Sequence, residues 1–446
     1  MSMTLQKNSL PEKKILVFGA GKSTTCLIDY LLKQAADHNW QVIVADGNLE
    51  QAEAKSGASP FALPVQVDVK DHESRNALIV QSDIVISMLP PGLHPLVAEN
   101  CVAAGRHLLT ASYVDETIKR MEPEIRKKGL LFLCEMGLDP GIDHMSAMQL
   151  IHRIRAGGEK ITSFHSHCGG LVAPESDDNP WHYKISWNPR NVVMAGKTGA
   201  VYKSNNEIRQ LPYHLLFDPS RTTAIAGHGY FAWYPNRDSL AYISLYTLED
   251  CSTFIRTTLR HPDFCTGWKK VIELNLTDEI HPYDTRELTY REFFQTHLLQ
   301  HDLTGAAIGD NREKNMLAYL GFYDDEKIGN GVCTAADVLQ KALENKLKLK
   351  QQDRDMVIMQ HELEHGTENQ RRKTISTLVV KGEDSTHTAM ARTVGLPLGI
   401  AATLILQGKI TLAGLHIPIV PEIYTPVLAA LKEEGIVFEE SVSNFT

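Results

Sequence analysis

Short apolar runs alternate with longer segments of helical periodicity over the first third of the chain. The runs are Ile15–Phe18, Val42–Ala45, Val65–Val67, Ile84–Ile86, His107–Leu109 and Leu130–Leu133. Apolar strands this short, separated by helices, suit a parallel sheet that is buried on both faces. We therefore predict a doubly wound α/β domain over residues 1–135.

The pattern changes after residue 135, where Pro, Gly, Trp and Tyr become denser and a second domain of mixed strands is predicted to begin. Periodicity predicts three amphipathic helices further on, at Tyr290–His301, Asn311–Leu320 and Thr334–Lys346. A strand is expected at Ile375–Gly382. A helix is expected at about 388–407, with Gly395 and Pro397 starting or kinking it.

A glycine turn follows the first predicted strand and predicts a dinucleotide site of the Rossmann type. Gly19 permits the tight turn, Gly21 lets the backbone approach a pyrophosphate, and the next helix presents free N–H groups. The second strand ends in Asp46, whose carboxylate can hold both ribose hydroxyls and would repel a 2′-phosphate. No arginine stands in Asp46-Gly47-Asn48, so NAD is the predicted cofactor, with NADP possible.

The same turn contains Gly21-Lys22-Ser23, which is also the end of a triphosphate-binding loop. That motif needs a glycine five residues before Gly21, where this chain has Leu16 inside the strand, and the interpretation is therefore disfavoured. The dinucleotide motif is itself incomplete, because Thr24 replaces its third glycine.

Charge and cysteine content exclude several classes of partner. The 446 residues carry a formal charge of −9 without runs of Lys or Arg, which argues against nucleic acid and acidic membranes. We find no apolar stretch of the ~18 residues that a membrane span needs, and the N-terminus, polar to Lys14, lacks a secretory signal. The seven cysteines form no Cys-x-x-Cys pair, so we expect thiols and a cytoplasmic location.

Two aspartates open the second domain. Asp139 precedes Pro140 and is pushed toward an extended conformation, while Asp143 is placed to cap the helix Met145–Arg155. We expect one aspartate to cap and the other to reach the binding cleft. The alternative, in which both merely build the turn, is open from turn chemistry alone.

Two histidine-containing segments raise the question of a metal. The composition around His165, His167 and Cys168 predicts a binding loop, but no second cysteine or carboxylate is suitably spaced for a metal site. Residues 361–365 read HELEH, the zinc-protease motif, yet Gly366 ends the helix at once and no third ligand follows. We predict no metal and interpret 361–365 as a solvated helix end or a hairpin.

Several long strings, in this order, resemble saccharopine dehydrogenase of the glutamate-forming type, the saccharopine reductase family. They are residues 82–116, EMGLDPGIDHMSAM (135–148), HCGGLVAPESDDNPWHYKISW (167–187) and YPNRDS (234–239). The resemblance implies NAD(P)-dependent oxidation of saccharopine, a secondary amine, to an imine that water splits into L-glutamate and 2-aminoadipate 6-semialdehyde, a reaction of lysine metabolism.

The resemblance also implies a domain plan. A substrate and dimerisation domain of α+β type would comprise 136–287 and 372–387, and a small helical subdomain would comprise 288–371. Helices of about 388–446 would pack back on the cofactor domain, and a homodimer is expected.

The predicted site residues fall into three groups, of which the catalytic and substrate groups are implied by the resemblance. Catalytic candidates are Tyr113, Asp139 and Cys168. Substrate contacts are expected from Ser112, Tyr113, Asp139, Arg237, Thr258, Leu259 and Arg260. Cofactor contacts are expected from Gly19, Ala20, Gly21, Lys22, Ser23, Asp46, Asp68, Val69, Leu89, Ala111, Ser112, Leu138, Pro140 and Asn188.

The residue types fit a substrate with three carboxylates. Arg237 and Arg260 are the expected carboxylate clamps, because a guanidinium binds a carboxylate through two parallel hydrogen bonds. Asp139 would stabilise positive charge as the imine forms. Tyr113 and Cys168 are candidates for proton relay. Both Arg237 and Asp68 also have a structural interpretation. Arg237 could stabilise a turn, and Asp68 could cap a helix or build a turn.

The chain departs from the family pattern at three positions, Val172, Thr24 and Asp46. Two other functions therefore stay open beside the zinc protease. One is a related amine-forming reductase acting on another amino-acid or polyamine adduct, like carboxynorspermidine dehydrogenase. The other is a non-catalytic protein that senses NAD.

Overall fold

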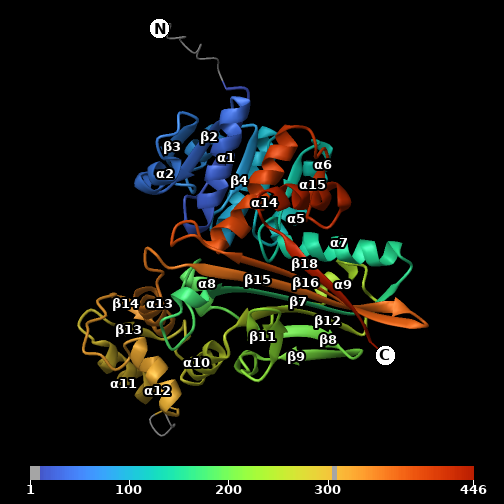
Figure 1. Cartoon of the computed structure of the whole chain (residues 1–446). Coiled ribbons are helices and arrows are strands. Elements are labelled where there is room, and N and C mark those ends of the chain that lie inside the picture. The colour runs from blue at the N-terminus through green and yellow to red at the C-terminus, as the bar shows by residue number, and fades with distance from the viewer. Residues whose placement is uncertain (1–10, 304–308, 446) are drawn as a thin grey trace, which may run out of the picture. The chain divides into compact units, whose positions relative to one another are not determined.

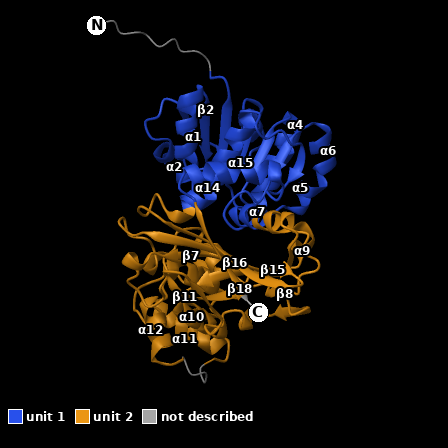
Figure 2. Ribbon diagram, turned by 45° about the vertical axis from the view of Figure 1, so that its right-hand side comes forward, with its two compact units in different colours: residues 1–149, 391–436 blue, residues 150–390, 437–446 orange. Residues whose placement is uncertain are grey.

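The computed structural model describes residues 11–303 and 309–445, and the chain forms two compact units (Figure 1). Unit 1 comprises residues 1–149 and 391–436, and unit 2 comprises 150–390 and 437–446 (Figure 2). The prediction about a secretory signal concerns residues 1–14, of which 1–10 lie outside the described residues.

Unit 1 is built on a parallel sheet of seven strands in the order β17-β6-β5-β4-β1-β2-β3. Six of these strands were predicted, and the doubly wound fold is confirmed. Their side chains are largely buried because helices cover both faces. The strands are β1 (Lys14–Phe18), β2 (Gln41–Asp46), β3 (Ala62–Gln66), β4 (Ile84–Ser87), β5 (His107–Thr110), β6 (Leu131–Leu133) and β17 (Gly414–His416). The seventh strand, β17, comes from the C-terminal part of the chain and pairs with β6.

The helices of unit 1 connect these strands in sequence, and two come from the C-terminal segment. They are α1 (Thr25–His38), α2 (Leu49–Ser56), α3 (His72–Val80), α4 (His94–Ala104), α5 (Glu116–Arg120), α6 (Glu122–Lys127), α7 (Ile142–Ala156), α14 (Ala389–Leu406) and α15 (Pro421–Glu433), with one-turn helices η1 (Lys22–Thr24) and η2 (Pro91–Leu93). Helices α7 and α14 each run from one unit into the other.

Helix α14 differs from its prediction because it runs through Gly395 and Pro397. A Cβ added to Gly395 would lie 2.9 Å from the Leu27 nitrogen, and one on Gly399 would lie 2.8 Å from the Tyr30 ring. The glycines therefore allow α14 to pack closely on α1. By length and composition α14 could cross a membrane, but 83% of it is buried within the protein, as in a core helix.

Unit 2 contains a mixed sheet of nine strands around β7. Seven follow the order β10-β11-β12-β7-β15-β16-β18, while β8 pairs with β12 and β9. Strand β7 (Lys160–Val172) is parallel to β12 (Thr253–Arg260) and antiparallel to β15 (Asp355–Thr367). The other strands are β8 (Ala200–Ser204), β9 (Glu207–Leu211), β10 (Thr222–Ile225), β11 (Gly229–Pro235), β16 (Gln370–Lys381) and β18 (Phe438–Phe445).

Five helices of unit 2, α8 and α10 to α13, share an aromatic-rich core with the residues that follow β7. Three of them confirm the predicted amphipathic helices: α11 (Tyr290–Gln300), α12 (Asn311–Tyr319) and α13 (Ala335–Lys346). The remaining elements are α8 (Pro189–Val193), α9 (Ala241–Leu245), α10 (Pro262–Glu273), the one-turn helices η3 (Pro174–Ser176) and η4 (Tyr213–Leu215), and the pair β13 (Pro282–Asp284) and β14 (Val332–Thr334).

The division into units differs from the expected domain plan at three places. Residues 136–149 belong to unit 1, and residues 355–371 lie in the hairpin of β15 and β16 rather than in a helical subdomain. The segment 438–445 is a strand that pairs with β16, not a helix on the cofactor domain. For the two strand segments, pairing with distant strands outweighs the local pattern, because β15 gains two neighbours in the sheet and β18 gains one.

Candidate cofactor and substrate site

The glycine turn after β1 has the geometry that a nucleotide site needs. Gly19 has φ 101°, and a Cβ there would lie 2.9 Å from the Met88 carbonyl oxygen. Gly21 is exposed, and a Cβ there would meet nothing within 4 Å, so the backbone is open to an incoming phosphate. Lys22 and Ser23 form the one-turn helix that leads into α1. The Thr24 hydroxyl donates to the Gly21 carbonyl at 2.8 Å, which gives the substituted third glycine a role in closing the turn.

Asp46 fixes this turn from the end of β2. Its Oδ2 accepts from the Ala20 N–H at 2.7 Å and its Oδ1 from the Asn48 N–H at 2.8 Å. Because each carboxylate oxygen has a second lone pair, both can still accept a ribose hydroxyl. The carboxylate is therefore held in a defined direction before any ligand binds.

A cavity of about 630 Å³ lies at the ends of β1 to β4. Its lining includes four predicted cofactor residues, Asp46, Asp68, Val69 and Leu89, and none of its ten residues is basic: Phe18, Ala45, Asp46, Gly47, Gln66, Val67, Asp68, Val69, Leu89 and Leu93. Asp68 also builds a turn, since its Oδ1 accepts from the Lys70 N–H at 2.9 Å. The apolar walls and two carboxylates fit an adenosine with free ribose hydroxyls.

The segment after β5 carries Ala111, Ser112 and Tyr113, all partly buried. Beneath it lies His94, a buried residue that was not among the predicted site residues. His94 Nδ1 lies 2.8 Å from the Ser87 hydroxyl and Nε2 lies 2.8 Å from the Ser112 hydroxyl. Burial lowers the pKa of His94 to about 4, so the imidazole is neutral near pH 7. We infer that His94 orients the Ser112 hydroxyl. Its position at the start of α4, two residues after Pro90-Pro91-Gly92, was the available sequence signal.

We expect replacement of His94 with Gln to make the free energy of unfolding less dependent on pH between pH 7 and pH 4. The folded pKa of about 4 lies below the unfolded value of 6.5, so the unfolded chain binds more protons between these pH values and stability is lost as pH falls. The free energy of unfolding of the wild type should fall by about 3 kcal/mol more than that of the variant between pH 7 and pH 4. Urea denaturation at each pH measures this, and parallel curves would contradict it.

A second buried group surrounds Asp139. Asp143 Oδ1 accepts from the Gly141 N–H at 2.6 Å, so Asp143 holds the turn, while Asp139 is only partly buried. The Glu135 carboxylate contacts His144 Nε2 at 2.8 Å and accepts from the Val114 N–H at 3.3 Å. This buried pair joins the segments that carry Tyr113 and Asp139, and sequence reasoning missed it.

Leu138 and Pro140, both predicted cofactor residues, are buried in the same turn. The Asp143 N–H donates to the Leu138 carbonyl at 3.1 Å, and the Gly137 N–H donates to the Pro140 carbonyl at 3.0 Å. Their backbone groups thus hold the turn that presents Asp139.

In unit 2, neighbouring strands bring four predicted residues together. Cys168 of β7 lies opposite Thr258 of β12 in a parallel register, and Leu259 and Arg260 follow at the end of β12. The Cys168 side chain is 5% exposed. The sheet therefore collects at one point residues that are 90 positions apart in the sequence.

The Arg260 guanidinium packs mainly against aromatic rings. Its side chain is 3% exposed, and its guanidinium carbon lies 5.2 Å from the centre of the Tyr183 ring and 5.4 Å from that of Phe264. Nη1 donates to the Leu259 carbonyl at 2.8 Å, whereas Nε has no hydrogen-bond partner. A buried N–H without a partner costs free energy that a bound carboxylate would recover.

The two remaining predicted residues have structural roles in the described chain. Arg237 is exposed in the turn after β11 with φ 51°, in line with its turn alternative. The exposed Asn188 caps α8, its side chain accepting from the Arg190 N–H at 2.9 Å. The contact of Arg237 with the substrate and that of Asn188 with the cofactor remain predictions.

The zinc-protease interpretation fails on geometry, since residues 361–365 form part of strand β15. At about 3.3 Å per residue the two histidines are ~13 Å apart along the strand, too far for one zinc ion. Of the two earlier interpretations the hairpin is confirmed, because β15 turns into β16; the segment is buried rather than solvated. His167 also is buried, with Nδ1 2.6 Å from the Thr257 hydroxyl.

Comparison with known proteins gives two matches to family models. The saccharopine dehydrogenase NADP binding domain matches residues 15–133, and the saccharopine dehydrogenase C-terminal domain matches residues 137–436. Together the two matches cover most of the chain.

Curated proteins and solved structures agree with these matches. Saccharopine dehydrogenase [NADP(+), L-glutamate-forming] of Saccharomyces cerevisiae is 33% identical over 96% of this chain and 99% of its own length. The bovine mitochondrial alpha-aminoadipic semialdehyde synthase is 34% identical over 96% of this chain, which spans about half (47%) of that protein. The apo structure of the L-Glu-forming saccharopine dehydrogenase of S. cerevisiae superposes with a TM-score of 0.87 at 32% identity, over 97% of this chain and 100% of that one.

Proposed function

Because the chain belongs to the saccharopine dehydrogenase family, we propose that it oxidises saccharopine with a nicotinamide cofactor and releases L-glutamate and 2-aminoadipate 6-semialdehyde. The single observation that carries the proposal beyond family membership is Arg260. A buried guanidinium with an unpartnered Nε fits a substrate that bears several carboxylates.

The glycine turn and Asp46 are the residues that would hold the cofactor. The chemistry that the cofactor supplies when bound is acceptance of a hydride from the carbon beside the amine nitrogen. Backbone N–H groups at Gly21 and at the start of the following helix would bind the pyrophosphate, and Asp46 the ribose. Ser112, oriented by His94, would fix the neighbouring part of the ligand.

The protein's own groups would then orient the amine and stabilise charge. Arg260 would bind a substrate carboxylate, and Asp139 would stabilise the positive nitrogen as the C=N bond forms. Water adds to that carbon, and cleavage of the C–N bond gives the aldehyde and the amino group of glutamate. Tyr113 and Cys168 are the candidates for moving protons in these steps.

We further propose that NAD is preferred over NADP. The support is electrostatic: the lining of the adenosine cavity holds the carboxylates of Asp46 and Asp68 and no basic side chain. A 2′-phosphate there would face negative charge without a cation to balance it. The yeast relative is named for NADP(+), so this preference would distinguish the present chain from it.

Steady-state turnover of saccharopine with NAD and with NADP tests both proposals. We expect glutamate and the semialdehyde in equal amounts, with a higher kcat/KM for NAD. Absence of turnover with saccharopine, together with turnover of another amino-acid or polyamine adduct, would assign the chain to a different amine substrate. NAD binding without turnover of any amine would make it a sensor.

Location and assembly are proposals of the same kind. All seven cysteines are thiols in the structure, which is compatible with the reducing cytoplasm. A homodimer stays the expectation from the family, and sedimentation measures it.

A further inference from the structure

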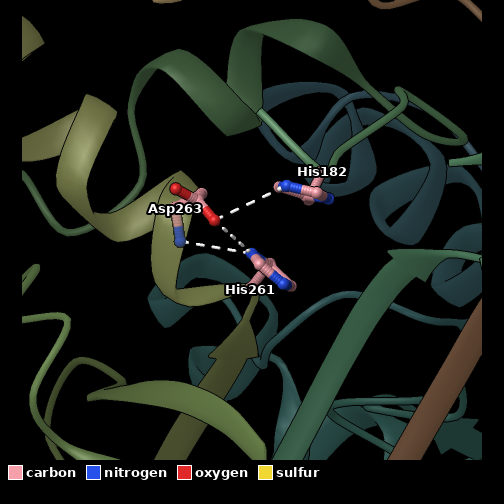
Figure 3. A group of neighbouring side chains, drawn as sticks. All are labelled: His182, His261 and Asp263. Carbon is pink, nitrogen blue, oxygen red and sulfur yellow. Dashed lines mark hydrogen bonds and ion pairs between the residues drawn. The ribbon is translucent and has the colours of Figure 1, made fainter. Parts of the chain in front are cut away.

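We propose that His182, His261 and Asp263 form a binding site for a divalent cation of the zinc type in unit 2. Figure 3 shows the three side chains converging from the loop before α8 and from the start of α10. Their three ligand atoms all lie within 4.8 Å of one another. The sequence predicted no metal here, because residues 182 and 261 are 79 positions apart and form no known motif.

The distances from the carboxylate oxygen to the two ring nitrogens are close to those of a tetrahedral site. Asp263 Oδ2 lies 3.5 Å from His182 Nε2 and 3.1 Å from His261 Nδ1. With zinc–ligand distances of about 2.0–2.1 Å, tetrahedral geometry sets neighbouring ligand atoms about 3.3 Å apart. Two nitrogens and one carboxylate oxygen are typical zinc ligands, and the fourth position would be left for water or an anion.

A second carboxylate orients one of the histidines, as is usual around bound metals. His182 Nδ1 lies 2.6 Å from Asp177 Oδ2, so the Nδ1–H donates to this carboxylate and Nε2, 3.5 Å from Asp263 Oδ2, keeps its lone pair. Such a carboxylate–histidine pair fixes the tautomer and raises the basicity of the ligating nitrogen. Asp177 Oδ1 is buried without a hydrogen-bond partner, which adds unbalanced negative charge beside the site.

The other histidine presents the lone pair of Nδ1 to the site. His261 Nδ1 now accepts from the Asp263 N–H at 3.2 Å, a bond that caps α10. A bound cation would be coordinated by the lone pair of His261 Nδ1. The hydrogen bond that caps α10 would then be replaced by coordination of His261 and Asp263 to the same ion.

One group opposes cation binding and supplies a test. The Arg312 guanidinium forms an ion pair with Asp263 Oδ1, the carboxylate oxygen that does not face the histidines. Its positive charge should weaken the affinity for a cation. We therefore expect Arg312→Gln to bind Zn²⁺ about 3- to 5-fold more tightly, the range of an exposed ion pair. A purely structural network of ion pairs would gain no zinc affinity from this change.

The main experiment titrates the purified full chain with Zn²⁺ alone by calorimetry and with Co²⁺ by visible absorption. The wild type should bind one more ion than His182→Asn/His261→Asn and show a four-coordinate Co²⁺ spectrum that the double variant lacks. Asn is chosen because His182 has φ 47°, which Asn tolerates, and because Asn is a good cap at position 261. Asp177→Asn, which keeps all three ligands, should weaken binding about 10- to 100-fold.

Two controls locate the ion. His228→Asn changes an exposed turn histidine and should leave binding unchanged. His281→Asn alters the second histidine–carboxylate group, Asp278, His281 and His301, and should not remove the ion assigned here. Equal stoichiometry and affinity in the wild type and the double variant would overturn the proposal, as would absence of binding by the wild type. If the double variant fails to fold, Asp177→Asn and Arg312→Gln still test the proposed cation site.

Discussion

Replacement of Asp46 with Ser should raise the dissociation constant for NAD about 100-fold and leave NADP binding little changed or tighter. The carboxylate accepts from the Ala20 and Asn48 N–H groups and can hold the ribose hydroxyls. Hydrogen bonds to a charged acceptor contribute about 1.5–3 kcal/mol each, so losing the ribose contacts costs about 3 kcal/mol, or a factor of ~100. Fluorescence titration of the reduced cofactors measures both constants.

Two matched variants separate charge from hydrogen bonding and from general effects on the cavity. Asp46→Asn keeps one acceptor oxygen but removes the charge, so it should lose discrimination against NADP while retaining more NAD affinity than Asp46→Ser. Asp68→Asn changes the other carboxylate of the cavity and should shift the ratio of the two constants less than 5-fold, since electrostatic attraction and repulsion fall with distance. A wild type that prefers NADP, with the same ratio in Asp46→Ser, would refute the electrostatic argument.

Replacement of Arg260 with Lys should lower kcat/KM for saccharopine about 100- to 1000-fold. Lysine keeps the charge but cannot form two parallel hydrogen bonds to a carboxylate, and it loses the stacking over Tyr183 and Phe264. A buried charged contact of this kind is worth about 3–4 kcal/mol. Initial rates at varied saccharopine, with NAD saturating, give the value.

The exposed Arg237 provides the comparison for this variant. Because solvent screens its charge, Arg237→Lys should lower kcat/KM less than 10-fold. Thermal unfolding of each variant checks that the fold is kept. Arg260→Lys with normal folding and kcat/KM within 3-fold of the wild type would remove Arg260 from the substrate site and, with it, the main structural support for the proposed reaction.

Much of the cofactor domain could be predicted because its signals are local. Apolar runs of three or four residues, a glycine turn and a carboxylate at the end of the second strand are local features of the sequence, and each has one favourable structure. Helices α11 to α13 were predictable for the same reason, since each has its own helical period. The strand β15 was not, because its two histidines are buried only by pairing with β7 and β16.

The site was predicted less completely than the fold. The positions of Asp46, Asp68, Val69 and Leu89 around one cavity follow from the parallel sheet, whose strand ends lie at one edge. His94 and the Glu135–His144 pair were missed because a buried histidine is recognised by its partners, and these partners are 7 to 18 residues away. Likewise, nothing in the order of residues joined His182 to His261.

The sequence by itself determined the dinucleotide motif, the strand–helix alternation of the first domain and, through long strings such as GLDPGIDH, the family. Each of these features is formed by residues close together in the sequence, so local sterics and periodicity are enough to recognise it. Only the tertiary structure decided that Arg260 is buried with an unpartnered N–H, that β17 and β18 return to different sheets, and that His182 meets Asp263. Burial and contact between distant residues depend on how the whole chain packs, and no local pattern fixes them.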